Sequence, residues 1–219
     1  GLMEELGVTS QTVNIAEVVR MQFKNIDQDE NVHDVTYENV QARIRTMYLM
    51  NLANLEKGIV LGTGDMSEIA LGWSTFNGDH MSMYNLNSGL PKTTNKALVK
   101  YFITIYPKVK NELKKVYNAV ISPELTGFDQ ATEDKIGKYQ INDFILYHIF
   151  MRGASKERII YLLGICFHLE SNDCLKYYEN FMRRFNLNQY KRLTSAEGIK
   201  IFKLTLNPRG DFRYPGDMK

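Results

Sequence analysis

A polar, glycine-rich run over residues 62–93 constrains this chain more than any other feature. The run opens with Gly-Thr-Gly-Asp and closes with Pro-Lys-Thr, and it carries hydroxyls, carboxylates and a single lysine. It is too polar for a core and too long for an ordinary connection. Ordering such a segment costs conformational entropy, which a ligand or a special geometry must offset. The run therefore indicates a phosphate and metal site.

A short apolar segment stands directly before this run. Residues 58–61, Gly-Ile-Val-Leu, are β-branched and apolar and predict a buried strand. Ligands of open α/β sheets bind beyond the carboxyl ends of strands. Thr63 offers a hydroxyl and an amide to a nucleotide, while Asp65 and Glu68 offer hard carboxylate oxygens to Mg²⁺.

The common nucleotide motifs are absent from the sequence. The glycines at 62 and 64 are followed by Ser67 instead of the third glycine of a dinucleotide fingerprint, and no Gly-Lys-Ser/Thr occurs. A lone Gly-x-Gly after a strand is equally compatible with a tight turn into a helix. The neighbouring acids, Trp73 and Lys92 favour the ligand site.

The run resembles the signature of the synthetase domain of glutamine-dependent NAD synthetases. The resemblance extends back through residues 31–46, and forward to Gln-Tyr-Lys-Arg at 189–192 and Asn-Pro-Arg-Gly-Asp-Phe-Arg at 207–213. It covers nearly the whole chain. It implies an α/β fold of the adenine nucleotide alpha hydrolase-like type, with a parallel sheet, flanking helices and a helical C-terminal region.

The reaction implied by this resemblance has two steps. The nicotinate carboxylate of deamido-NAD attacks the α-phosphate of ATP, which gives an adenylate and pyrophosphate. Ammonia, released from glutamine in a separate amino-terminal domain, then displaces AMP and forms NAD. A ligase of this kind depends on positioned anions and charge stabilisation, including Mg²⁺ at the departing pyrophosphate. The resemblance also implies a homo-oligomer.

One family element is missing. The pyrophosphate loop, Ser-Gly-Gly-x-Asp-Ser, occurs nowhere in the 219 residues. Residues 1–8 are typical of a helix end that leads to a strand at Gln11 to Ile15, so the first strand and its loop are expected upstream. We therefore expect residues 1–219 to be the C-terminal part of one synthetase domain, with the loop and the glutaminase domain outside this chain.

Composition agrees with a globular domain, since 44% of residues are hydrophobic and 24% are charged. No apolar run reaches the roughly 18 residues of a membrane span, and we expect a cytoplasmic protein. A net charge of +2 is too small to indicate nucleic acid. Cys166 and Cys174 lack metal-ligand spacing and are expected to be reduced structural thiols.

Apolar periodicity predicts six helices. Asp34 or Thr36 is the expected N-cap of the second, on which Asn39, Arg43 and Thr46 share one face. The predicted ranges are Ile15 to Asn25, Thr36 to Glu56, Thr93 to Tyr106, Gly137 to Met151, Ser155 to Phe167 and Asn172 to Phe185.

The resemblance assigns roles to particular residues. Glu68 and Lys92 are the candidate catalytic residues, and Glu68 is also the candidate metal ligand. ATP is expected at Thr63, Lys92 and Ser122. Deamido-NAD is expected at Asn39, Arg43, Glu68, Trp73, Ser74, Thr75, Phe76, Asp79 and Lys191.

Simpler readings stay open for several of these side chains. Arg43 also suits a surface ion pair, and Trp73 and Phe76 also suit ordinary core packing. Lys92 also suits a solvated position, and Ser122 a turn before proline. His80 is interpreted as a structural histidine, because the reaction does not demand acid–base catalysis.

Two further expectations concern mobility and function. The segment from Thr126 to Lys138 has few apolar anchors and is a candidate lid over the adenylate. Residues 193–198 lack the proline that is usual in the family. This difference affects how the C-terminal segment is expected to fold over the site, more than it affects the expected substrate class. The alternative functions are a related ATP pyrophosphatase resembling GMP synthetase, and a non-catalytic nucleotide-binding or assembly module.

Overall fold

The computed structural model describes residues 1–119 and 132–217. Ser122 and residues 126–131 of the candidate lid lie outside this part of the chain. The helices are α1 (Leu2–Glu5), α2 (Ala16–Asn25), α3 (Val35–Leu55), α4 (Met66–Leu71), α5 (Lys92–Ile105), α6 (Lys110–Asn118), α7 (Thr132–Ile136), α8 (Tyr139–Arg152), α9 (Lys156–Phe167), α10 (Ser171–Leu187) and α11 (Gln189–Leu193), with a 3₁₀ turn at Pro107–Val109.

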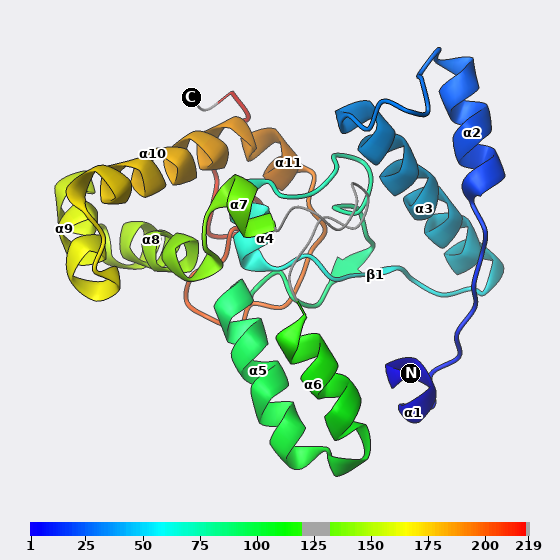
Figure 1. Cartoon of the computed structure of the whole chain (residues 1–219), viewed down its shortest axis with the longest axis horizontal. Coiled ribbons are helices and arrows are strands. Elements are labelled where there is room, and N and C mark those ends of the chain that lie inside the picture. Colours follow the sequence, from blue (N-terminus) through cyan, green and yellow to red (C-terminus); the bar gives the residue numbers. More distant parts are fainter. Residues whose placement is uncertain (120–131, 218–219) are drawn as a thin grey trace.

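The sheet is small and parallel. Strand β1 (Leu61–Gly62) pairs with β2 (Tyr84–Asn85) in the register Leu61 to Tyr84 and Gly62 to Asn85. Helices lie on both sides of this pair in Figure 1, with α2 and α3 on one side and α8 to α10 on the other. The predicted α/β class with a parallel sheet, flanking helices and a helical C-terminal region is confirmed.

All six predicted helices are present, as α2, α3, α5, α8, α9 and α10, with ends displaced by at most two residues. Asp34 is the N-cap of α3, where its Oδ1 accepts from the amides of Thr36 and Tyr37 at 2.9 Å each. Sequence analysis missed the short helices α4, α7 and α11 and the nine-residue α6. Segments of about one turn carry too little apolar periodicity to be recognised.

One predicted strand is shorter than expected and the other is absent. Residues 58–60 lie outside β1, although the carbonyl of Val60 accepts from the amide of Met83 at 3.0 Å, and the segment is not buried, since Ile59 is 63% and Leu61 48% exposed. Residues 11–15 form no strand. A parallel strand becomes buried only when helices cover both faces of a wider sheet. Among the described residues only two short strands pair, so this environment is not formed.

The lid prediction also needs a correction in its described half. Residues 132–136 form helix α7, in which Thr132 and Ile136 are buried. Ile136 is fully enclosed in the main hydrophobic core. That half of the segment is therefore anchored by apolar contacts.

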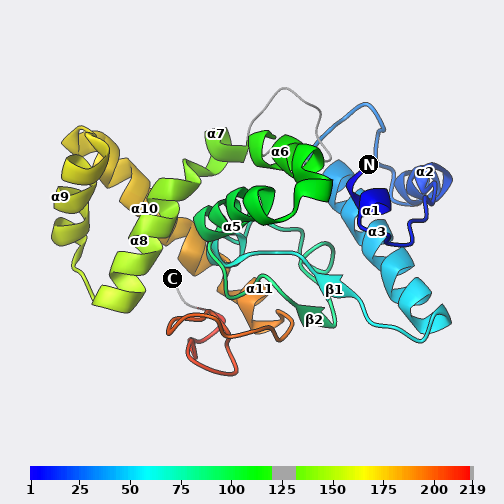
Figure 2. The same cartoon turned by 90° about the horizontal axis from the view of Figure 1, so that it is seen from below.

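The main core lies between α4, α8, α9 and α10. Its fully buried members include Leu71, Ile145, Leu163 and Phe181. A separate, smaller cluster joins α2 to α3 through Phe23 and neighbouring residues. Figure 2 shows α8 to α10 and α2 with α3 at opposite ends of the molecule. Helix α4 and the residues after it lie between these two packed regions.

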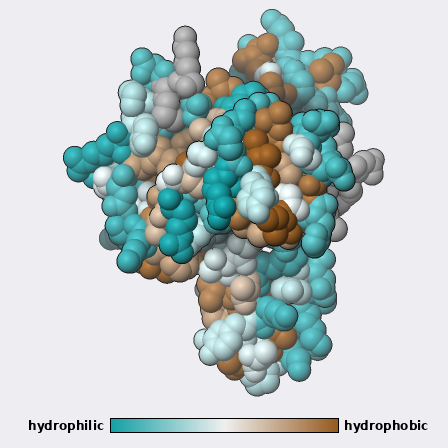
Figure 3. Space-filling model, turned by 90° about the vertical axis from the view of Figure 1, so that its left-hand side faces the viewer, coloured by the Kyte–Doolittle hydropathy of each residue, from teal (hydrophilic) through white to brown (hydrophobic). Residues whose placement is uncertain are grey.

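Helices α5 and α6 form an antiparallel pair that projects from the body of the molecule. Figure 3, which views the side on which α9 lies, shows this pair below the main mass. Lys92 is the first residue of α5, so the base of the projecting pair meets the body beside α4. The fold thereby brings the start of α5 to the start of α4.

Candidate functional site

The first turn of α4 holds two carboxylates side by side. Asp65 is the N-cap, and its Oδ1 accepts from the amide of Glu68 at 3.0 Å. In return, Glu68 Oε2 accepts from the amide of Asp65 at 3.0 Å. This reciprocal capping box satisfies two otherwise free amides and sets the direction of both side chains. Asp65 is 1% exposed.

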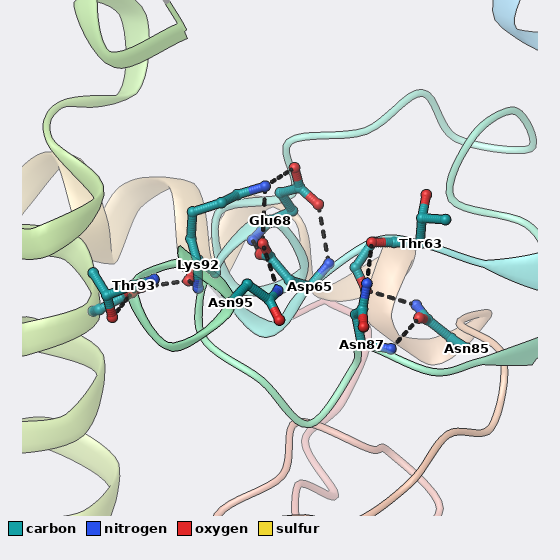
Figure 4. Close-up of polar contacts among 11 residues, drawn as sticks. Thr63, Asp65, Glu68, Asn85, Asn87, Lys92, Thr93 and Asn95 are labelled. Atoms are coloured by element: carbon teal, nitrogen blue, oxygen red, sulfur yellow. Dashed lines mark hydrogen bonds and ion pairs between the residues drawn. The ribbon is translucent and has the colours of Figure 1, made fainter. Parts of the chain in front are cut away.

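Lys92 lies between these two carboxylates. Its Nζ is 2.6 Å from Glu68 Oε1 and 2.8 Å from Asp65 Oδ2, and Figure 4 shows the ammonium group directed at both. Burial would lower the pKa of Lys92, but the charges of Asp65 and Glu68 outweigh it and raise that pKa. Burial raises the pKa of Asp65, and burial with the charge of Asp65 raises that of Glu68. The ammonium is thus held charged.

A third carboxylate, from α8, orients the start of α5. The N-cap of α5 is Pro91, which has no capping side chain. Asp143 Oδ2 accepts instead from the Thr93 amide at 3.0 Å and the Thr93 hydroxyl at 2.7 Å. Asp143 Oδ1 accepts from the hydroxyl of Ser67, which in turn accepts from the Lys92 amide at 2.8 Å. Asp143 therefore fixes the backbone from which Lys92 extends.

Sequence analysis missed Asp143. Its one available signal was an acid inside an otherwise apolar helical stretch, which is unusual unless the acid has partners. Those partners come from α4 and from the start of α5, 76 and 50 residues earlier in the chain, respectively. Such separations leave no trace in local periodicity.

The turn at residues 62–64 is held by two asparagines, one in β2 and one just after it. Asn85 Nδ2 donates to the carbonyl of Gly64 at 2.9 Å, and Asn87 Nδ2 donates to the carbonyl of Thr63 at 3.3 Å. A Cβ on Gly62 would lie 2.4 Å from Ser82 Oγ, so this close approach requires glycine. Thr63 is exposed, and in Figure 4 its side chain points away from these backbone contacts. Its hydroxyl is therefore presented at the surface of the turn.

The predicted face of α3 contacts the loop after α4. The hydroxyl of Thr75 donates to Asn39 Oδ1 at 2.9 Å, and Arg43 Nε donates to the carbonyl of Phe76 at 3.2 Å. Among the described residues, no ion pair involves Arg43. Thr46 turns back to the carbonyl of Ala42 instead. Asn39 and Arg43 thus act together on one loop, as their spacing predicted.

The other end of α4 is tied down by α11. Gly72 ends the helix at φ 60°, and a Cβ there would lie 2.1 Å from Asn188 Cγ. Lys191 Nζ donates to the carbonyls of Gly72 and Ser74 at 2.8 and 2.7 Å. Burial, followed by the charge of Arg184, lowers the pKa of Lys191. Lys191 therefore lies against the loop where the resemblance expects the dinucleotide.

Trp73 and Phe76 have different surroundings. Trp73 packs partly against the main core, and the Arg184 guanidinium lies 5.2 Å from its ring centroid. Phe76 is 37% exposed and stacks on His80 with ring centroids 5.2 Å apart. Asp79 Oδ1 accepts from the amide of Thr75 at 2.6 Å and closes the loop. Phe76 is therefore the more accessible ring.

His80 is a structural histidine, as its sequence context suggested. Its Nδ1 accepts from the amide of Asn77 at 3.0 Å, and its Nε2 lies 3.1 Å from the hydroxyl of Thr194. Both ring nitrogens are thereby used, and Nδ1 carries no proton in this arrangement. Burial and the charge of Lys191 lower the pKa of His80, which is consistent with a neutral ring.

The residues present fit a phosphate-bound Mg²⁺ better than a protein cage. Within residues 1–119 and 132–217, no group of three His, Cys, Asp or Glu side chains is arranged to hold a metal ion. Mg²⁺ commonly uses one or two carboxylates and completes its shell with phosphates and water. Asp65 and Glu68 each use one oxygen in the capping box and the other in the ion pair with Lys92. The side chain of Glu68 is 23% exposed and that of Asp65 only 1%, so Glu68 is the carboxylate that suits such an ion.

Residues 1–193 match the family model described as NAD synthase. The chain belongs to the NAD synthase family. The glutamine-dependent NAD(+) synthetase of Mycobacterium bovis is 36% identical over 99% of this chain, and that of Aquifex aeolicus 30% identical over 91%. The chain spans about a third of the length of these relatives, 37% and 33%.

Solved structures of NAD synthase relatives share the fold. A glutamine-dependent NAD(+) synthetase from Cytophaga hutchinsonii superposes with a TM-score of 0.76 at 18% identity, over 98% of this chain and 35% of that one. An identity this low supports the fold alone.

Two remaining expectations concern cysteines and membranes. Cys166 is exposed and Cys174 buried, and both are free thiols, as expected. Among the described residues, no helix has the length and apolar character needed to cross a bilayer.

Proposed function

We propose that the natural protein carrying this chain converts deamido-NAD into NAD at the expense of ATP, through an adenylate, with ammonia drawn from glutamine. Membership of the NAD synthase family supports the reaction class. The observation that carries the assignment is that Lys92 and Glu68 meet at one end of α4 while Asn39 and Arg43 hold the loop at its other end. Six helical residues separate the two ends by about 9 Å, which suits the two substrates of one transfer.

ATP is assigned to the N-terminal end of α4. The Lys92 ammonium is a fixed, charged group whose position is set by Asp143 and the capping box. A charge held in place before the reaction stabilises negative charge on departing pyrophosphate without reorganisation. Thr63 presents its hydroxyl on the turn that leads into α4, and Ser122 is assigned to ATP on the resemblance alone.

Glu68 is assigned to the Mg²⁺ that accompanies ATP. The ion supplies Lewis-acid neutralisation of phosphate charge when it is bound. For Glu68, this role means exchanging or sharing the contact that it now makes with Lys92. Lys92 then keeps its contact with Asp65 Oδ2 and turns the donor released by Glu68 to phosphate oxygens.

Deamido-NAD is assigned to the loop at residues 73–79 and its supports. Ser74, Thr75 and Asp79 provide hydroxyls and a carboxylate, and Phe76 provides an accessible ring. Asn39 and Arg43 shape the loop from α3, and Lys191 from α11. An ammonium has three donors, so Lys191 keeps one for the substrate after donating to two carbonyls.

The remaining assignments concern the assembly. We assign residues 1–219 to one synthetase domain that works with a glutaminase domain in a cytoplasmic homo-oligomer. The names of the relatives, which specify glutamine dependence, support the nitrogen source. Two alternatives are a GMP synthetase-like pyrophosphatase and a non-catalytic nucleotide-binding module. The family match favours neither.

The function is tested with the natural protein, ATP, Mg²⁺ and deamido-NAD, with glutamine or ammonium supplied in parallel. NAD and AMP should form in equal amounts. Turnover of xanthosine monophosphate instead would select the pyrophosphatase alternative, and binding without turnover would select the module.

Lys92→Met is the informative variant, with Lys100→Met, exposed on the same helix, as its control. Charged hydrogen bonds contribute roughly 1.5–3 kcal/mol, so Lys92→Met should lower kcat/KM for ATP by about tenfold or more. Lys100→Met should be neutral. Equal kinetics for both variants would remove Lys92 from the ATP site.

A further inference from the structure

Helix α10 carries two adjacent arginines with opposite environments. Arg183 is exposed, and its Nη2 donates to Asn180 Oδ1 at 2.8 Å, one turn earlier on the same helix. Arg184 is partly buried and faces the body of the molecule, where its guanidinium lies over the ring of Trp73. The inward arginine is thus placed beside the loop assigned to the dinucleotide.

Arg184 has no anionic partner within the described residues. It takes part in no ion pair there, and its Nε is shielded from solvent without a hydrogen-bond partner. Burial lowers the pKa of Arg184. Buried charges in proteins are normally paired, because taking them from water is costly. The Trp73 ring offsets only part of that cost.

Arg192 shows what this fold does with an arginine that is purely structural. Arg192 is completely buried, and its donors reach the carbonyls of Ile69, Ala70 and Phe185 and the side chain of Gln189. Every face of that guanidinium is occupied by the protein. Arg184 lies one helix away and lacks any such set of acceptors.

A second unpartnered donor stands near Arg184. Tyr139, the first residue of α8, is 3% exposed, and its hydroxyl makes no hydrogen bond in the described structure. Its ring centroid lies 5.3 Å from Lys92 Nζ, and an ionised Tyr139 would raise the pKa of Arg184, which places the two side chains within electrostatic range of each other.

We propose that Arg184, with the Tyr139 hydroxyl as a neighbouring donor, forms an oxyanion subsite that takes a phosphate or carboxylate of a substrate beside Trp73. A guanidinium binds either group through paired hydrogen bonds. The subsite extends the proposed function and rests on it for the identity of the substrate. Neither residue carried a role in the sequence-based assignment.

The only tryptophan of the chain provides a direct readout. Trp73 lies against Arg184, so an anion bound there should change the Trp73 emission. Inorganic pyrophosphate and nicotinate serve as probes of the phosphate and carboxylate classes. In the natural protein, with its Trp73→Phe variant measured in parallel to isolate the emission of Trp73, at least one probe should change this emission saturably. Arg184→Gln should weaken that response tenfold or more. Arg183→Gln should leave it unchanged.

Binding of deamido-NAD, NAD and ATP then identifies the source of the anion. A loss for deamido-NAD but not NAD in Arg184→Gln assigns the carboxylate, because NAD has an amide at that position. A loss for both dinucleotides assigns their phosphates, and a loss for ATP alone assigns the triphosphate. Wild-type Kd values for all three in Arg184→Gln would overturn the subsite.

Further variants separate folding from binding. Urea unfolding first checks that Arg184→Gln folds. Arg184→Lys keeps the charge without the paired donors and should recover part of the affinity, whereas Tyr139→Phe removes one donor and should weaken it about threefold. Wild-type binding by these two variants would also contradict the proposal.

The subsite and the enzyme activity fail independently. If the natural protein makes NAD and its Arg184→Gln variant has wild-type kinetics, the proposed function stands and the subsite is excluded. An Arg184-dependent response to pyrophosphate in a protein that makes no NAD would leave the subsite and remove the function.

Discussion

The two ends of helix α4 hold cations in opposite ways. At its start, Lys92 is bound by the side-chain carboxylates of Asp65 and Glu68. At its end, Lys191 and Arg192 are bound by backbone carbonyls of the helix and of the turn that follows. Both arrangements bury positive charge, but the acceptor groups differ in how easily they can move away from the cation.

Carbonyls at a helix C-terminus are free acceptors that attract cations, and their positions are fixed by the backbone. A cation bound to them can leave only if the turn rearranges. A carboxylate on a rotatable side chain, such as Glu68, can turn to a metal ion while the helix stays intact. The C-terminal end is therefore part of the fold, and the N-terminal end is suited to exchange partners with phosphate.

The largest effect that would break this comparison is expected at Arg192. Arg192→Met keeps the buried volume but leaves the carbonyls of Ile69, Ala70 and Phe185 without donors. Breaking a buried polar network of this kind costs roughly 3–5 kcal/mol. Urea unfolding should show this loss, with Arg183→Met as the exposed control. A loss below that of the control would mean that Arg192 does not hold the end of α4.

A smaller effect is expected at Asp143, the anchor of the opposite end. Asp143→Asn removes the charge that caps α5, which should cost about 1–2 kcal/mol, the usual value of a lost cap. The same change should raise KM for ATP more than it lowers kcat, because it displaces Lys92 without removing it. Asp173→Asn, in an exposed ion pair with Lys176, is the control.

Two outcomes would argue against this positioning role. If Asp143→Asn loses stability but keeps wild-type kinetics with ATP, Asp143 is only a structural cap of α5. Equal stability for both variants would show that α5 starts without its help.

The smallest expected effect is the pH dependence of stability that His80 causes, near the C-terminal end of α4. His80 has a pKa below its ordinary value of 6.5 in the folded chain, so the unfolded state binds more protons as pH falls. Stability from a neutral His80 is therefore present above pH 6.5 and declines as pH falls through the folded pKa. Protonation would also break the hydrogen bond from Asn77.

The measurement is the difference in unfolding free energy between wild type and His80→Gln, taken at pH 7.5 and at pH 5.5. Wild type should lose more stability than the variant over this interval. The opposite sign would mean that the folded chain favours the charged ring.

Local patterns were sufficient for the long helices and for one face of α3. The spacing of Asn39 and Arg43 predicted joint action, and the structure places both against the same loop. Local patterns failed at the strands, where Ile59 and Leu61 look like core residues and are exposed. Burial of a strand depends on neighbours that a segment of four residues cannot specify.

The sequence by itself determined the chain's family, its main helices, and the run at 62–93 that carries most of the site. Only the tertiary structure decided which charges are committed to the fold and which are not. Arg184 and Arg192 are the same residue type, eight positions apart, yet Arg192 donates to carbonyls, whereas Nε of Arg184 has no acceptor among the described residues. The reason is that hydrogen-bond partners come from helices distant in sequence, whose approach depends on packing of the whole core.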